Sequence, residues 1–136
     1  MYLIDTNIFL EVLLERENKD ECVSLLRRIE RGEIEAFTTS FTVHSIEVIM
    51  DHFKKIKELK IFLETIKGFK GLNIYYTSIG EEISAIEEMI ERLDFDDALQ
   101  SYVAKKLGAK IVSFDKHFDK VKGLSRSRPE EVVKGR

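Results

Sequence analysis

Residues 2–13 have the sequence YLIDTNIFLEVL. A short apolar run ends in the carboxylate Asp5 and passes directly into a segment whose apolar residues recur at helical spacing, so the stretch predicts a buried strand followed by a helix. Residues 94–115, DFDDALQSYVAKKLGAKIVSFD, predict the opposite order. There an apolar helix face ends near Gly108, and the strand that follows ends at Asp115.

The same alternation continues through the rest of the chain. The patterns predict helices at 18–32, 42–53, 56–66, 78–90 and from Pro129 onward, and strands at 34–39 and 72–76 with a weak edge strand at 124–128. Strands that alternate with helices predict parallel pairing, right-handed crossovers and helices on both faces of one sheet. We therefore expect residues 1–136 to form one three-layer α/β/α domain with about five strands.

Composition limits the classes of function. The single cysteine, Cys22, excludes a disulfide framework and any zinc site with two thiolates. No apolar run reaches the ~20 residues of a membrane span, so we expect a cytoplasmic protein without membrane partners. The 35% charged residues and few amides resemble thermophile proteins. Because the net charge is −3, a polyanionic partner must find a local basic face.

Carboxylates from distant parts of the chain are expected at one edge of the sheet. Ligand crevices in parallel sheets lie at the carboxyl ends of the strands. Asp5 and Asp115 end two strands, and Asp97 opens a helix that runs back to that same edge. Glu47 lies near the second turn of the helix after the second strand, between apolar neighbours. The topology therefore predicts four carboxylates facing one crevice.

A cluster of this kind favours a divalent cation. Carboxylates a few ångströms apart repel one another and raise each other's pKa unless a cation lies between them. Oxygen-only ligands suit Mg²⁺ or Mn²⁺ better than zinc. One or two such ions activate water and stabilise a leaving oxygen, and phosphodiester hydrolysis is the chemistry that this arrangement favours.

Four segments, in this order and spacing, resemble the PIN-domain nucleases, including the VapC-type toxins of toxin–antitoxin pairs. They are LIDTNIFL (3–10), Glu47 in its apolar helix, DAL (97–99) and VSFDKHF (112–118). The resemblance covers about residues 1–124. It implies strand order 3-2-1-4-5, dependence on Mg²⁺ or Mn²⁺, and endoribonuclease activity on single-stranded RNA, with metal-activated water leaving a 5′-phosphate and a 3′-hydroxyl. It also implies a homodimer and, for a toxin, an antitoxin partner.

The resemblance assigns roles to eight residues. The expected catalytic residues and metal ligands are Asp5, Glu47, Asp97 and Asp115. The polar residues expected to orient these ligands or a bound water are Thr6, Asn7, Asp96 and Ser113. Neighbours on a helix point about 100° apart, so only one of Asp96 and Asp97 faces the site squarely, and Asp97 is our choice.

Basic residues near the crevice are candidates for RNA contacts. Binding along an RNA backbone needs positive charge at the crevice rim, and the best-placed residues are Lys116, Arg126 and Arg128. Two alternatives stay open for the acids: Asp5 as a simple helix cap, and Asp119 as a solvent-facing residue.

Other functions remain as alternatives. A stand-alone PIN nuclease in RNA processing would carry the same four acids. A non-catalytic RNA-binding module of the same fold is a further alternative, against which the intact set of acids argues. A receiver-like domain requires paired acids after the first strand, and a dehalogenase-like phosphatase requires a second Asp two residues after the first. Asp5 stands alone and the second position is Asn7, so neither pattern is met.

Overall fold

A computed structural model describes residues 1–135 and contains one parallel sheet of five strands in the order β3-β2-β1-β4-β5. The strands are β1 (Tyr2–Ile4), β2 (Ala36–Thr39), β3 (Leu72–Tyr75), β4 (Lys110–Val112) and β5 (Arg126–Ser127). The predicted strand order 3-2-1-4-5 is confirmed. β1 lies at the centre, where it pairs with β2 and β4, and it therefore brings Asp5 to the middle of the carboxyl edge.

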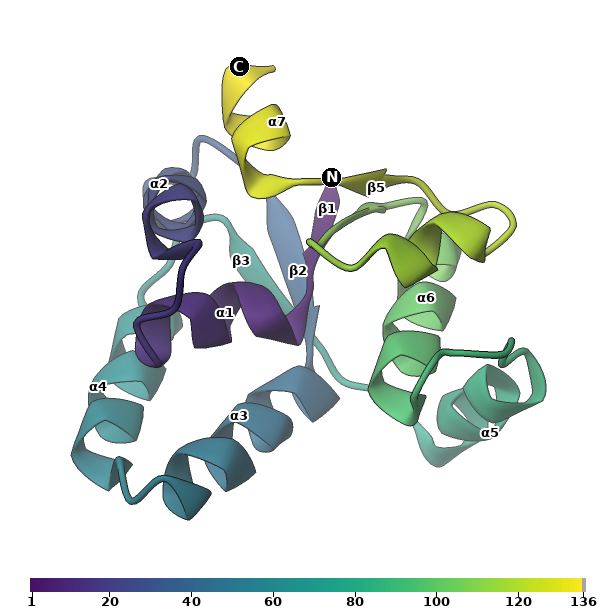
Figure 1. Cartoon of the computed structure of the whole chain (residues 1–136), viewed down its shortest axis with the longest axis horizontal. Helices are drawn as coiled ribbons and strands as arrows, with labels where there is room; N and C mark the ends of the chain where they lie inside the picture. The colour runs from purple at the N-terminus through teal and green to yellow at the C-terminus, as the bar shows by residue number, and fades with distance from the viewer. Residues whose placement is uncertain (136) are drawn as a thin grey trace.

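Helices cover both faces of the sheet (Figure 1). They are α1 (Thr6–Leu13), α2 (Lys19–Glu30), α3 (Ser40–His52), α4 (Ile56–Lys67), α5 (Ile79–Glu87), α6 (Phe95–Leu107) and α7 (Pro129–Lys134). The larger core joins α1, α2, α3, α4 and α7 to one face, and α6 packs on the other with α5 beside it. The predicted three-layer α/β/α arrangement is therefore confirmed.

The central strand β1 is short, and its last two residues are buried on opposite faces of the sheet. Successive side chains of a strand point to opposite faces, and accordingly Ile4 belongs to the larger core while Leu3 packs against Val103 and Ala104 of α6. All four residues are fully buried. Full burial on both sides explains why β1 is an unbroken apolar run up to Asp5.

Gly108 sets the direction of α6. Its φ of +67° lies in the left-handed region that favours glycine, and it ends α6 immediately before β4. α6 therefore runs antiparallel to the strands, and its first turn, with Asp96 and Asp97, lies at the carboxyl edge.

Two local differences from the predicted elements occur near this edge. The helix predicted to reach residue 90 ends at Glu87, and Arg92, with a φ of +74°, turns the chain toward the start of α6. A short 3₁₀ helix that the sequence patterns do not predict, η1 (Lys116–Lys120), follows Asp115 and is anchored by the buried Phe118. Among residues 1–135, no helix has the length and apolar character needed to cross a bilayer.

Candidate metal centre

Asp5 lies at the junction of β1 and α1, with its backbone N–H bonded to the Val112 carbonyl at 3.1 Å. It occupies the N-cap position of α1, yet its carboxylate makes no capping hydrogen bond. Instead Oδ2 accepts a bond from Ser113 Oγ at 2.7 Å, and Oδ1 accepts one from Gln100 Nε2 at 2.9 Å. The carboxylate is therefore held by α6 and by the end of β4, not by its own helix.

Burial dominates the electrostatics of Asp5. The residue is 2% exposed, and burial raises the pKa of its carboxyl to about 6. The hydrogen bonds from Ser113 and Gln100 oppose this rise, while the negative charges of Asp96 and Asp115 add to it. At neutral pH the buried Asp5 carboxylate is charged at a cost in free energy, and a positive charge nearby would lower that cost.

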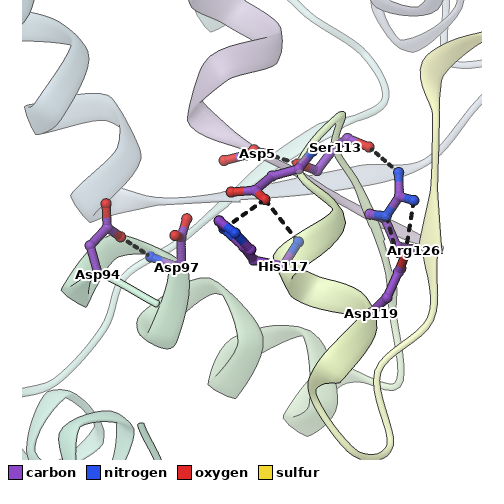
Figure 2. Close-up of polar contacts among 8 residues, drawn as sticks. Asp5, Asp94, Asp97, Ser113, His117, Asp119 and Arg126 are labelled. Atoms are coloured by element: carbon purple, nitrogen blue, oxygen red, sulfur yellow. Dashed lines mark hydrogen bonds and ion pairs between the residues drawn. The ribbon is translucent and has the colours of Figure 1, made fainter. Parts of the chain in front are cut away.

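Asp97 approaches from the first turn of α6. Its backbone N–H donates to Oδ1 of Asp94 at 2.8 Å, which makes Asp94 the N-cap of the helix (Figure 2). Burial, followed by the charges of Asp94 and Asp5, raises the pKa of Asp97 to about 7. Asp5 and Asp97 therefore come together from β1 and α6.

Asp96 enters the same region by another route. Its Oδ2 accepts a hydrogen bond from Thr6 Oγ1 at 2.8 Å, and its Oδ1 is buried without a hydrogen-bond partner among residues 1–135. Burial raises its pKa as well. Adjacent acids on α6 thus have different partners: the Asp97 N–H bonds to Asp94, and the Asp96 carboxylate accepts a bond from Thr6 at the start of α1.

A chain of buried hydroxyls supports Asp96 from β2 and α3. Thr6 Oγ1 lies 2.8 Å from Thr42 Oγ1, and Thr39 Oγ1 donates to Thr42 Oγ1 at 3.2 Å. With Thr6 donating to Asp96, the hydroxyls connect the ends of β2 and β1 to α6. A buried network of hydrogen bonds of this kind fixes the relative positions of its elements.

Removing the Thr6 hydroxyl is expected to weaken this junction. Thr6→Val has nearly the same shape but leaves the buried Asp96 carboxylate without its donor, so we expect a loss of about 1–3 kcal/mol in the free energy of unfolding. Urea denaturation measures it. The exposed Thr65→Val is the matched control and should change stability by less than about 0.5 kcal/mol. A Thr6→Val protein as stable as the control would mean that the hydroxyl bond contributes nothing.

Asp115 reaches the cluster through Ser113. Its backbone N–H donates to Ser113 Oγ at 2.9 Å, the same hydroxyl that donates to Asp5. Its Oδ1 accepts a bond from the His117 N–H at 2.8 Å and lies 3.1 Å from His117 Nδ1 (Figure 2). Ser113 therefore couples two of the predicted acids.

The structure does not bring Glu47 into this group. Oε1 of Glu47 lies 2.8 Å from Nδ1 of His44, on the partly exposed side of α3. Thr42 marks the side of α3 that faces Thr6. Five residues along a helix correspond to about 140° of rotation, so Glu47 lies on a different side of α3 from Thr42.

The remaining predicted residues differ in accessibility. Asn7 and Lys116 are exposed. Arg128 stacks over the Phe114 ring at 5.0 Å and pairs with Glu130. The Arg126 side chain is only 13% exposed and is directed to Asp119 and to the Ser113 carbonyl.

Sequence reasoning missed Gln100, the only glutamine of the chain. It is fully buried, donates to Asp5, and leaves its own Oε1 without a hydrogen-bond partner among the described residues. The available signal was a lone amide one turn after Asp96, between the buried positions Leu99 and Val103. Buried amides need polar partners, so its position pointed to the acids.

The donor set suits a hard divalent cation. Among residues 1–135, no three His, Cys, Asp or Glu side chains converge as a finished metal site. Mg²⁺ and Mn²⁺ retain several waters, however, and need only one or two carboxylates. Burial raises the pKa of Asp5 and of Asp97, the charge of Asp5 adds to the rise at Asp97, and Asp96 Oδ1 is a buried acceptor without a hydrogen-bond partner among the described residues. The residues present therefore fit such an ion.

Comparison with known proteins identifies the class. Residues 2–124 match the model of the PIN domain family, and the chain belongs to this family. A search of the curated proteins gave no match.

Several solved structures share the fold. VapC20 from Mycobacterium tuberculosis, described as a sarcin–ricin loop cleaving toxin, has a TM-score of 0.72 and 13% identity, with 90% of this chain and 95% of that chain covered. VapBC2 from Rickettsia felis, bound to promoter DNA, has a TM-score of 0.67 and 18% identity, with 93% and 97% covered. FitAcB from Neisseria gonorrhoeae has a TM-score of 0.69 and 15% identity, with 96% and 99% covered. At these identities the likeness concerns the fold.

Proposed function

We propose that this PIN-domain protein is a Mg²⁺- or Mn²⁺-dependent endoribonuclease that hydrolyses single-stranded RNA in the cytoplasm and is the toxin of a toxin–antitoxin pair. The observation that carries the proposal is the acidic cluster of Asp5, Asp97 and Asp115 at the carboxyl edge of the sheet. Family membership and the likeness to VapC20 support a nuclease.

The residues have separate tasks in this proposal. Asp5 and Asp97 would hold the cation together with Asp115, and one or two bound ions would supply activated water and stabilise the leaving oxygen. Ser113 and Gln100 fix the orientation of the Asp5 carboxylate through its two oxygens. Lys116 is exposed next to Asp115 and attracts the RNA backbone.

The direct test is cleavage of a labelled single-stranded RNA by purified protein in Mn²⁺, in Mg²⁺ and in EDTA. We expect cleavage in either metal and none in EDTA, with products that carry a 5′-phosphate and a 3′-hydroxyl. RNA binding without cleavage in any metal would favour a non-catalytic RNA-binding module. Cleavage that persists in EDTA would contradict the proposed chemistry.

An antitoxin partner is proposed from a solved toxin–antitoxin complex that shares the fold. An apolar groove of about 480 Å³ between α1, α2 and α4, with Phe9, Leu26 and Phe62 in its walls, offers a seat for an apolar peptide segment. The discriminating observation is a small adjacent gene whose product suppresses cleavage. Without such a product, a stand-alone nuclease in RNA processing becomes the better description.

A homodimer is proposed from the exposed apolar stripe of α5. Ile79, Ile83 and Ile86 are between 53% and 77% exposed, which is unusual for one helix of a monomer. A two-fold axis would pair this stripe with its own copy. We expect light scattering to find a dimer for the wild-type protein and a monomer for Ile83→Lys. A dimer in both would place the interface elsewhere, and a wild-type monomer would refute the homodimer.

A further inference from the structure

Arg126 is an arginine of β5 whose side chain turns inward instead of toward solvent. Its Nε and Nη2 donate to the two carboxylate oxygens of Asp119 at 2.9 and 3.1 Å, and its Nη1 donates to the Ser113 carbonyl at 3.1 Å. Figure 2 shows this guanidinium between η1 and the end of β4. Three contacts of one planar group fix its geometry in a way that a lysine cannot reproduce.

Arg126 contacts η1 and Ser113, which lie on either side of Asp115 in the chain. Asp119 belongs to η1, which begins immediately after Asp115, and Ser113 bonds both Asp5 and the Asp115 N–H. A 3₁₀ helix of five residues has weak internal hydrogen bonds and depends on outside contacts for its position. Phe118 anchors η1 to the core, and the Arg126–Asp119 pair is its polar attachment.

We infer that Arg126 and Asp119 form a clamp that positions Asp115 and Ser113 in the candidate metal centre, and that Arg126 acts as a positioning residue rather than an RNA contact. The inference rests on the proposed function. It also gives Asp119 a role, because its carboxylate holds Arg126 instead of binding metal. Contact with RNA phosphates would need a free guanidinium. The guanidinium of Arg126 instead makes three contacts inside the protein.

Asp119→Asn separates the two roles because they predict opposite results. Asp119 is exposed, so the variant is expected to fold. If Arg126 positions Asp115, loss of the pair lowers kcat and the affinity for Mn²⁺ by about tenfold each, while KM for RNA changes by less than about twofold. If Arg126 binds RNA, releasing it lowers KM and leaves kcat unchanged.

Three further variants complete the design. Arg126→Lys keeps the charge but loses the planar fork, so a fall in kcat there reports geometry and not net charge. Asp119→Glu restores the carboxylate and is expected to recover part of the kcat lost in Asp119→Asn. Lys116→Gln is the comparison for RNA contact and is expected to raise KM with little effect on kcat.

Two measurements do not depend on RNA cleavage. Mn²⁺ affinity is measured by calorimetry with the metal alone, and hydrogen exchange follows the Asp115 and His117 amides, both of which are bonded in the structure. The clamp predicts exchange faster by at least about tenfold at these amides in Asp119→Asn. A wild-type protein that cleaves no RNA would contradict the proposed function, and these two measurements would still decide the clamp. The clamp would be overturned if Asp119→Asn showed unchanged Mn²⁺ affinity, unchanged hydrogen exchange, or tighter RNA binding at unchanged kcat.

Discussion

Asp5→Asn and Asp97→Asn are each expected to lower the rate of Mn²⁺-dependent RNA cleavage by at least about 100-fold, equivalent to about 2.7 kcal/mol of transition-state stabilisation. Both substitutions keep the shape of the side chain and remove one negative charge from the cluster. In Asp5→Asn, the amide still has partners, because Ser113 and Gln100 contact the two ends of the group. The loss therefore reports on charge at the centre and not on unfolding.

Asp51→Asn is the matched control for this loss. Asp51 is exposed near the end of α3, far from the start of the helix that faces the cluster. Its substitution is expected to leave the cleavage rate within about twofold of the wild type. Equal rates for wild type, Asp5→Asn and Asp97→Asn would mean that the activity belongs to another site or to a contaminant.

Glu47→Gln tests the predicted metal ligand whose carboxylate pairs with His44 in the structure. Because its carboxylate contacts His44, we expect cleavage to fall by less than about tenfold. A loss equal to that of Asp97→Asn would return Glu47 to the metal centre.

The second large effect concerns stability without metal. In EDTA at pH 7.5, Asp5→Asn is expected to be more stable than the wild type by about 1–3 kcal/mol, and the difference is expected to vanish near pH 4. The pKa of Asp5 is about 6 in the folded protein against an ordinary 3.8. Between these values the folded state holds the proton that the unfolded state has released, so stability from this group falls as the pH rises through this window.

Adding Mn²⁺ reverses the order of the two proteins. Metal that binds only the folded state stabilises it in proportion to the logarithm of its concentration, by about 2.7 kcal/mol at 100 times the dissociation constant. At pH 7.5, only the wild-type protein should gain this stabilisation from Mn²⁺. Thermal unfolding at pH 4 and 7.5, with and without Mn²⁺, measures both effects. An Asp5→Asn protein that is less stable than the wild type in EDTA would mean that the bonds from Ser113 and Gln100 outweigh the cost of burying the charge.

The local pattern of the sequence was sufficient for the fold. The run before Asp5 has the expected structure because burial on both faces of a central parallel strand leaves only apolar residues there. The family resemblance added the strand order, which the pairing of β1 with β2 and β4 confirms. The short 3₁₀ helix after Asp115 was not predicted, since its position depends on contacts with β5 that are remote in sequence.

The candidate centre was only partly predictable. Topology brings Asp5, Asp97 and Asp115 to one edge, because each follows a strand or opens a helix there. The rotation of α3 decides where Glu47 points, and spacing alone does not fix that rotation. Gln100 and the inward turn of Arg126 depend on side-chain directions that become visible only when α6 and β5 are packed against β4.

Mn²⁺ binding to the purified protein, followed by electron paramagnetic resonance at pH 7.5, shows directly whether Asp5 and Asp97 form a metal centre. We expect the wild-type protein to bind one or two ions saturably. Binding should be retained in Asp51→Asn and lost or weakened by at least about tenfold in Asp5→Asn and Asp97→Asn. Equal binding in all four proteins would contradict a metal centre built on Asp5 and Asp97.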